Sequence, residues 1–120
     1  MAKAVSDDVL DAALTEIATS TTQTVCSAEP ANYAGIAAVA LAASTVAGGD
    51  FTIADGTTSG RKTTVAEQAG VSITASGDAT HVALDDGTTL QYVTTAPTQT
   101  LTSGGTVTVA AWAVELQDPA

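Results

Sequence analysis

The sequence predicts a mainly β protein, a compact antiparallel β-sandwich or barrel-like domain with one N-terminal α-helix. From residue 59 to residue 115, Thr alternates with Val, Leu and Ile, a period of two that puts one face of each strand on a core. Gly- and Asp-rich turns interrupt this alternation roughly every 8–12 residues, as in sandwiches and barrels. We expect a single domain over residues 1–120, with a helix over 6–18 and a β-rich body over 22–116.

The N-terminal helix is predicted by its cap and by one apolar stripe. Ser6 supplies a hydroxyl cap, and Asp7 and Asp8 follow at the positive end of the helix dipole. The helix should end within residues 19–22, where hydroxyl and β-branched side chains compete with it. Five apolar residues recur at helical spacing, which predicts that they pack onto a sheet: Val9, Leu10, Ala13, Leu14 and Ile17.

The first part of the body is less regular. Residues 24–27 have the composition of a short strand. Residues 33–46 are ambiguous, because their Ala content suits a helix while their β-branched residues and loose alternation favour a strand; we expect a strand and keep a helix as the alternative. A Gly-Gly-Asp turn at 48–50 leads into a strand at 51–53, and a second turn follows at 55–56.

The second part of the body predicts seven short strands without a clean repeat or a dividing linker. The sequence Asp85-Asp86-Gly87 predicts a hairpin that joins the third of these strands to the fourth. Val107 and Trp112, in the last two strands, are predicted core residues. The strands are expected over residues 62–68, 71–76, 80–84, 89–95, 99–102, 106–110 and 111–115.

The charge balance restricts the classes of partner. The chain has 13 acidic and three basic residues and a formal net charge of −10, and Lys3, Arg61 and Lys62 are its only basic residues. Binding of DNA or RNA needs a basic footprint, and attraction to an anionic membrane needs basic residues as well. We therefore expect neither nucleic acid nor membrane as a partner.

The composition also suggests that the fold gains stability from neighbours. Hydrophobic residues reach 45 %, but Ala is the commonest of them, and aromatic residues are only 3 %. Charged residues are 13 %, against about 25 % in an average soluble domain. A domain with few charges can bury its flanks in other subunits without desolvating ions, so we expect a homo-oligomer. The alternative is a protein kept soluble by its many hydroxyl groups.

Cysteine usage and hydropathy bear on the compartment. Cys26 is the single cysteine, so the chain cannot form an internal disulfide. The first eight residues lack the apolar stretch of a signal peptide, and the longest apolar run, residues 36–43, is too short to span a bilayer. We expect synthesis in a reducing cytoplasm.

Catalytic and metal-binding candidates are few. His81 lies in a predicted strand and could act as a base or a metal ligand, and Cys26 could be a nucleophile partnered by it. One His and one Cys complete neither a zinc set nor a triad from the usual residues. We expect a partly buried or interface histidine and a packed thiol, no catalytic residue, no metal and no cofactor, and hence no enzyme.

Two acidic turns resemble calcium sites only in outline. Residues 48–55 are similar to a single imperfect copy of a Gly-rich calcium-binding nonapeptide, which functions by stacking many copies. Asp85 and Asp86 are adjacent carboxylates, but the EF-hand spacing is absent. Turn chemistry explains these Asp and Gly residues without an ion.

Three aromatic residues could form a face that stacks on sugar rings. Tyr33, Tyr92 and Trp112 are the candidates for such a carbohydrate-binding site. Trp112 lies between two alanines in an apolar stretch, which favours a place for it in the core of a chain with so few large side chains.

Local strings along nearly the whole chain resemble a family of small virion structural proteins of tailed bacteriophages and prophages. The chain departs from this pattern at residues 36–43, which are rich in Ala. The strings that carry the resemblance are VLDAAL (9–14), VCSAEP (25–30), SGRK (59–62), ATHVAL (79–84), LTSGGTV (101–107), WAVE (112–115) and the ending DPA (118–120).

The resemblance implies a role in the phage particle. The expected function is that of a capsid decoration or cement protein, which binds the major capsid protein on the outer capsid surface and stabilises the head as an oligomer on its lattice. The alternatives are a tail or head–tail connector component, and a host-surface or carbohydrate-binding module of the virion. An N-terminal segment, either residues 1–5 before the Ser6 helix or a segment that includes this helix, is expected to reach onto the capsid.

Overall fold

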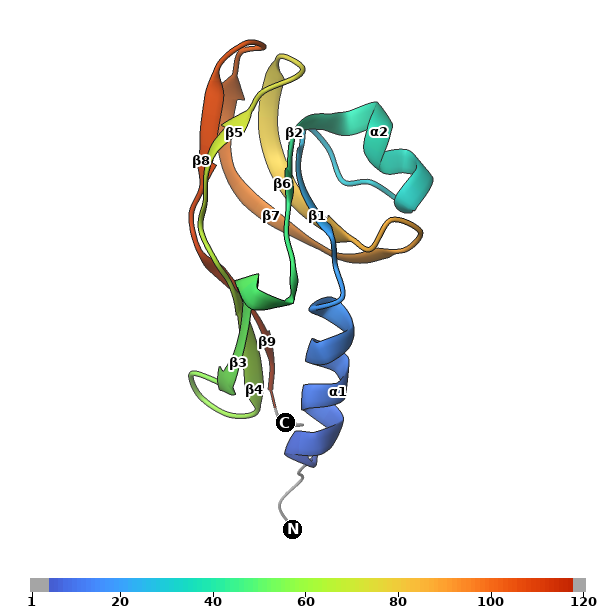
Figure 1. The fold of residues 1–120 in the computed structure, drawn as a ribbon, viewed down its shortest axis with the longest axis vertical. Coiled ribbons are helices and arrows are strands. Elements are labelled where there is room, and N and C mark those ends of the chain that lie inside the picture. Colours follow the sequence, from blue (N-terminus) through green and yellow to red (C-terminus); the bar gives the residue numbers. More distant parts are fainter. Residues whose placement is uncertain (1–4, 118–120) are drawn as a thin grey trace.

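Three antiparallel sheets and an N-terminal helix build the protein (Figure 1). The structure is a computed structural model and describes residues 5–117. The largest sheet has the strand order β2 (Ala40–Thr45), β1 (Thr22–Cys26), β6 (Gly77–Asp85) and β7 (Leu90–Leu101). The mainly β sandwich predicted from the alternation of Thr with aliphatic residues is confirmed.

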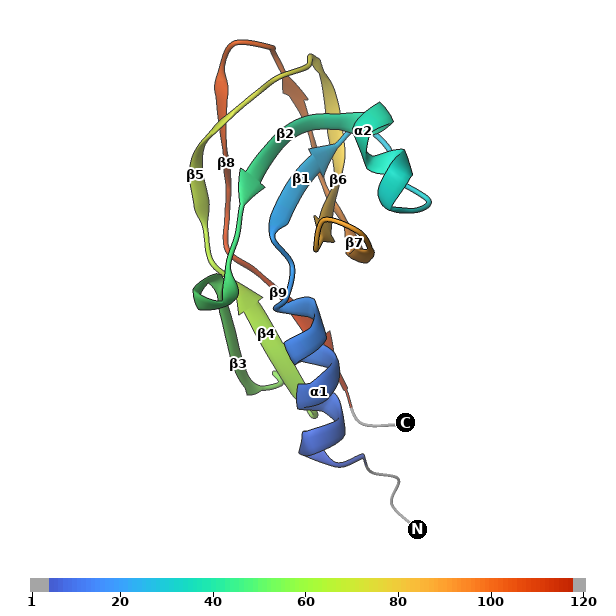
Figure 2. The ribbon, with the colours of Figure 1, turned by 45° about the vertical axis from the view of Figure 1, so that its right-hand side comes forward.

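A two-stranded sheet faces this four-stranded sheet and completes the sandwich (Figure 2). It consists of β5 (Gln68–Ser72) and β8 (Thr106–Val109). Backbone contacts join the two sheets at one side: Ala42 of β2 forms a bridge with Ile73, and the Thr74 N–H donates to the Leu41 carbonyl at 2.8 Å. The sandwich is therefore closed between β2 and β5.

The third sheet extends the molecule away from the sandwich. Its order is β3 (Phe51–Asp55), β4 (Arg61–Val65) and β9 (Trp112–Leu116). Along the chain β4 leads into β5 and β8 leads into β9, so one bent antiparallel ribbon runs through both parts (Figure 1). The molecule is elongated, with extents of 54 × 25 × 25 Å.

Helix α1 (Asp7–Ile17) begins at Ser6, whose Oγ accepts the Asp8 N–H at 3.1 Å, as its cap predicts. It packs beside β4 and buries Leu10 and Leu14. The prediction that all five apolar residues pack onto a sheet is wrong at two positions: Val9 is 58 % exposed and Ala13 is exposed. The reason is geometric, because α1 meets a narrow sheet at the end of the molecule and only one side of the stripe finds a partner.

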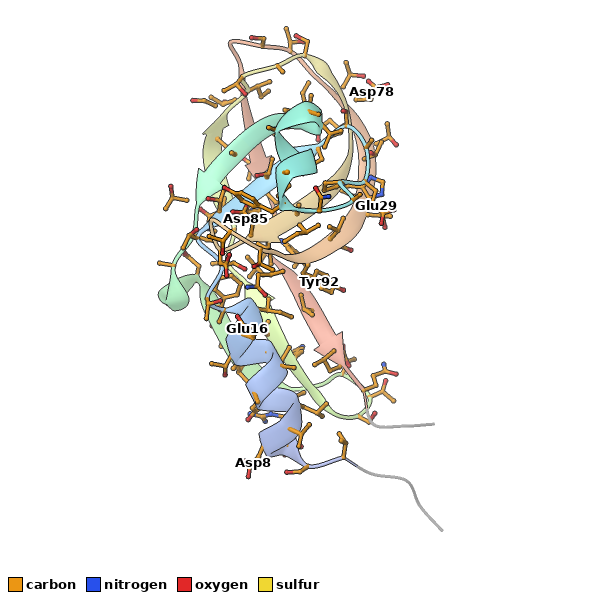
Figure 3. The ribbon with its side chains drawn as sticks, turned by 90° about the vertical axis from the view of Figure 1, so that its right-hand side faces the viewer. Asp8, Glu16, Glu29, Asp78, Asp85 and Tyr92 are labelled. Carbon is orange, nitrogen blue, oxygen red and sulfur yellow. The ribbon has the colours of Figure 1, made fainter. Side chains whose placement is uncertain are left out.

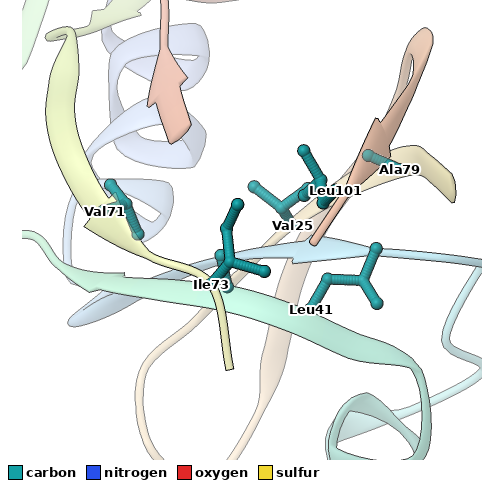
Figure 4. Close-up of a cluster of buried hydrophobic side chains, with 7 residues drawn as sticks. Val25, Leu41, Val71, Ile73, Ala79 and Leu101 are labelled. Atoms are coloured by element: carbon teal, nitrogen blue, oxygen red, sulfur yellow. The ribbon is translucent and has the colours of Figure 1, made fainter. Parts of the chain in front are cut away.

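Two clusters form the core. The first lies between the two sheets of the sandwich (Figure 4) and contains Val25, Leu41, Ala42, Val71, Ile73, Ala79 and Leu101. The second lies where the sandwich meets the three-stranded sheet and contains Val46, Phe51, Val65 and Leu84. Val107 and Trp112 are partly buried and pack against the first and the second cluster, respectively. Trp112, expected inside the core, therefore lies at its border.

The predicted strand over residues 33–46 is wrong in its first half. A 3₁₀ helix, η1 (Tyr33–Gly35), and the short helix α2 (Ile36–Val39) precede β2. The Asn32 side chain accepts the Gly35 N–H at 2.8 Å and caps this turn, and Ile36 is buried where α2 lies beside β1. The helix alternative is confirmed for 33–39 and the strand for 40–45.

Strand boundaries were also mispredicted in the ribbon. The strand expected over 62–68 divides at Ala66 and Glu67, where the chain passes from the three-stranded sheet to the two-stranded one. The strand expected over 71–76 ends at Ser72. Neither break has a strong turn signal, because both follow from how the sheets are arranged.

The strands expected over 89–95 and 99–102 are one strand, β7. Pro97 does not end it, because residues 96–98 bulge opposite Thr80 while pairing with β6 resumes at Gln99. The remaining strands fall close to their predicted positions, and the 85–87 hairpin between β6 and β7 is confirmed.

The β3–β4 turn requires a glycine at its last residue, directly before β4 begins. Gly60 has a φ of +71° there and approaches the Leu116 carbonyl so closely that a Cβ would not fit. The 3₁₀ helix η2 (Gly48–Asp50) forms the predicted turn before β3.

Candidate functional site

An apolar groove lies on the side of the sandwich opposite the bridge between β2 and β5. Its volume is about 370 Å³. Val25, Ala79 and Val82, from β1 and β6, form the floor. We call it the β7–β8 groove; its walls consist of Thr94, Thr95, Ala96, Pro97, Gln99 and Leu101 on one side and Val107, Thr108, Val109, Ala110, Ala111, Trp112 and Ala113 on the other.

Strand order explains why the groove is open. In the described part of the chain, β7 is the last strand of the four-stranded sheet and β8 is the last strand of the two-stranded sheet. The segment 102–105 links the two strands at one end, and no strand lies between them over the rest of their length. The groove is therefore bordered by backbone groups that point away from the partner strand on each side and can bond to another strand.

The strands that border the groove carry no charge. Residues 87–114, which include β7 and β8, contain no Asp, Glu, Lys, Arg or His. Several acidic residues lie on other elements: Asp8 and Glu16 are on α1, and Asp85 lies beside α2 (Figure 3). In a chain with a net charge of −10, the β7–β8 groove and its rim are electrically neutral.

Trp112 sits at one end of the groove and is held from two directions. Its ring stacks on Tyr92, with centroids 6.0 Å apart and planes 25° apart. Its Nε1–H donates to Oε1 of Gln23 at 2.7 Å, and Gln23 is 1 % exposed. This pair fixes the end of β9 against β1, over a sequence separation of 89 residues.

The structure does not unite the three aromatic candidates for a sugar site. Tyr92 is directly opposite Leu84 and faces the core, whereas Tyr33 borders a shallow pocket with Thr22 and Asp85 on the other face of the same sheet. Tyr33 is 41 % exposed and Tyr92 is covered on one side by Trp112. A single stacking face made of Tyr33, Tyr92 and Trp112 is not formed.

Cys26 and His81 are brought together, because they are direct partners in the β1–β6 register. The geometry does not activate the thiol. Burial raises the pKa of Cys26 to about 11, and its Sγ makes a long contact of 3.6 Å with the Thr24 carbonyl. The Nδ1 atom of His81 lies 2.8 Å from the Thr80 hydroxyl. At neutral pH Cys26 is a protonated thiol packed inside a sheet.

The acidic turns use their carboxylates to hold the backbone. Asp50 accepts the Ala47 N–H at 2.9 Å. Asp86 accepts the N–H groups of Thr88 and Thr89 at 2.9 and 2.7 Å, and these bonds lower the pKa of its carboxyl group. Within residues 5–117, no group of three or more His, Cys, Asp or Glu side chains is placed to hold a metal ion.

A charged contact anchors the N-terminal helix. The Nε of Arg61 donates to Asp11 of α1 at 2.8 Å, and its Nη1 donates to Asp55 at 2.6 Å. These hydrogen bonds, first of all the one with Asp11, raise the pKa of Arg61 above its ordinary value. Arg61 lies within a string that carries the virion-protein resemblance, and here it connects α1 to the sheet.

Sequence reasoning did not find the β7–β8 groove. The missing information is that β7 and β8, although adjacent along the chain, belong to different sheets. One signal was available: the charge-free stretch from 87 to 114 is long for a chain this acidic. The segment 1–5, expected to reach onto a capsid, lies almost wholly outside the described residues.

Comparisons of the chain with protein-family models, with curated proteins and with solved structures found no match. Among the residues that the structure describes, no helix has the length and apolar character required to cross a bilayer.

Proposed function

We propose that the chain is a non-enzymatic structural protein of a tailed-phage virion that decorates the outer surface of the capsid and stabilises the head. The proposal rests on the resemblance of its sequence strings to small virion proteins and on one structural observation. That observation is the β7–β8 groove: a neutral, apolar surface bordered by two unpaired strand edges, in an otherwise acidic protein.

Such a surface supports a role in an assembly. Exposed strand edges are normally protected by charged residues, because an unprotected edge pairs with other chains. Here neither β7 nor β8 carries a charged side chain, so burying them against protein costs no desolvation of ions. The acidic remainder of the surface disfavours contact with packaged DNA, which agrees with a place on the outside of the head.

The proposed partners are the major capsid protein and further copies of the chain, and the proposed location is the capsid surface after synthesis in the host cytoplasm. A tail or head–tail connector position remains the second candidate within the virion, and copy number separates it from decoration. The carbohydrate-binding alternative has less support, because Tyr33 and the Tyr92–Trp112 pair lie on opposite faces of one sheet.

Reconstitution tests the decoration role. Heads prepared from a phage that lacks this gene are incubated with the purified chain, and both the bound amount and the temperature at which the heads release DNA are measured. Decoration predicts saturable binding at a fixed fraction of the capsid lattice and a higher release temperature. Absence of binding at concentrations far above the number of lattice sites would contradict it. A chain lacking residues 1–5 should melt normally but occupy fewer sites.

A further inference from the structure

We infer that the unpaired edge of β8 is a self-association site, at which a second copy of this chain pairs antiparallel about a two-fold axis and covers the β7–β8 groove. The inference deepens the proposed function, on which it rests for its biological role. The physical argument uses only the fold, the charges and the strand register.

The charge distribution favours a second copy as the occupant. Two copies that each carry a net charge of −10 repel one another over most of their surfaces. The side formed by residues 87–114 is the long charge-free stretch through which copies can meet without bringing carboxylates together. Asp78 follows Gly77 at the start of β6 and precedes the groove residue Ala79, but alternation turns it to the opposite face, where it accepts the Thr100 hydroxyl at 2.9 Å.

Of the two edges, β8 is the one suited to pairing. The β7 edge is interrupted by the bulge at 96–98, and Pro97 has no N–H to donate. The β8 edge has neither proline nor charge. Its side chains alternate, with Val107 and Val109 partly buried toward the core and Thr106 and Thr108 exposed.

The alternation restricts the register of such a pair, and Thr108 is the exposed residue within β8 on which it can be centred. Directly opposite residues of antiparallel strands lie on the same face of a sheet, so the sum of paired residue numbers has to be even. A two-fold axis at Thr108 satisfies this condition: Thr108 faces its own copy, and Val107 of each strand faces Val109 of the other. Thr–Thr pairs and aliphatic pairs are favourable cross-strand neighbours, and the contact is self-complementary, as a two-fold interface requires.

Sedimentation velocity on the purified chain, without capsids, tests the inference. We expect a concentration-dependent species with twice the 11.8 kDa mass of the chain. Thr108→Glu places two carboxylates opposite one another at the axis and should weaken association at least about tenfold. Thr52→Glu is the matched control, because Thr52 is also an exposed strand threonine, on β3, and the change in net charge is identical.

A charge-swap experiment distinguishes this register from a general loss of folding. Thr108→Lys should also be monomeric, whereas an equimolar mixture of Thr108→Glu and Thr108→Lys should recover the dimer through opposite charges at the axis. A wild-type chain that is monomeric at every concentration, or Thr108→Glu that associates as well as Thr52→Glu, would overturn the inference. A monomeric chain found on virions overturns only this inference, and a self-associating chain absent from virions overturns only the proposed function.

Discussion

The indole Nε1–H of Trp112 donates a 2.7 Å hydrogen bond to the side-chain carbonyl of Gln23, which connects the last strand of the fold to the first. Gln23 is buried between the sandwich and the three-stranded sheet, and its Nε2 has no hydrogen-bond partner within the part of the chain that the structure describes. The bond thus satisfies one half of a buried amide. It connects the three-stranded sheet, through β9, to the four-stranded sheet, through β1.

Removing the indole N–H should destabilise the protein. Trp112→Phe leaves the buried Gln23 carbonyl without its donor, and we expect the free energy of unfolding to fall by about 1–3 kcal/mol. Adding Gln23→Leu replaces the whole amide by an apolar group of similar size, so the double variant should regain about 1 kcal/mol or more of this loss. Urea unfolding of both single variants and of the double variant measures the coupling. Equal free energies of unfolding for Trp112→Phe and the double variant would show that the unpaired Gln23 carbonyl does not lower the stability.

The two carboxylates that contact Arg61 should not be equivalent. Asp11 is 34 % exposed and belongs to α1, whereas Asp55 is 88 % exposed in β3, so solvent screens the second contact more strongly. Asp11→Asn should therefore loosen α1 from the sheet and speed hydrogen exchange of the α1 amides. Asp55→Asn is the control and should leave that exchange nearly unchanged. The reverse order would mean that Arg61 does not anchor the helix.

Acid should weaken the β6–β7 hairpin through Asp86. The N–H groups of Thr88 and Thr89 lower the pKa of this carboxyl group below its ordinary value of 3.8 in the folded state. A lowered native pKa contributes stability that is present above the unfolded pKa and is lost as the pH falls through the native pKa. Asp86→Asn keeps an acceptor oxygen but cannot be protonated in this range. Its melting temperature should therefore fall less than that of the wild type between about pH 5 and pH 2, and identical pH profiles would contradict this role.

The thiol of Cys26 should be inert in the native protein. Its pKa is raised from 9.0 to about 11 by burial, which alone reduces the thiolate fraction at pH 8 about 100-fold. Labelling with iodoacetamide at pH 8 should be at least that much slower for the native chain than for the urea-unfolded chain. Equal rates would mean that the β1–β6 face opens readily, and the packed-thiol interpretation would then be wrong.

Local sequence signals predicted the parts of the fold that local chemistry determines. Ser6 caps the helix, and Asp85-Asp86-Gly87 forms the hairpin, because both features depend on groups within a few residues of one another. The strands expected over 89–95 and 99–102 are one strand, since a bulge lets an edge strand continue past Pro97.

The candidate site could not be predicted in the same way. The β7–β8 groove exists because β2 meets β5 through Ala42 and Ile73 and closes the other side of the sandwich. The Arg61–Asp11 contact joins residues 50 apart. Such pairings are selected by the packing of whole sheets. The sequence shows only that residues 87–114 lack charge, and not which strands they place beside the groove.

The copy number of this chain relative to the major capsid protein, measured by quantitative mass spectrometry of purified virions, tests the decoration role most directly. A decoration protein predicts a ratio near one per capsid subunit, or another fixed fraction of the lattice. A handful of copies per particle would place the chain in the tail or connector, and its complete absence from virions would contradict the proposed function altogether.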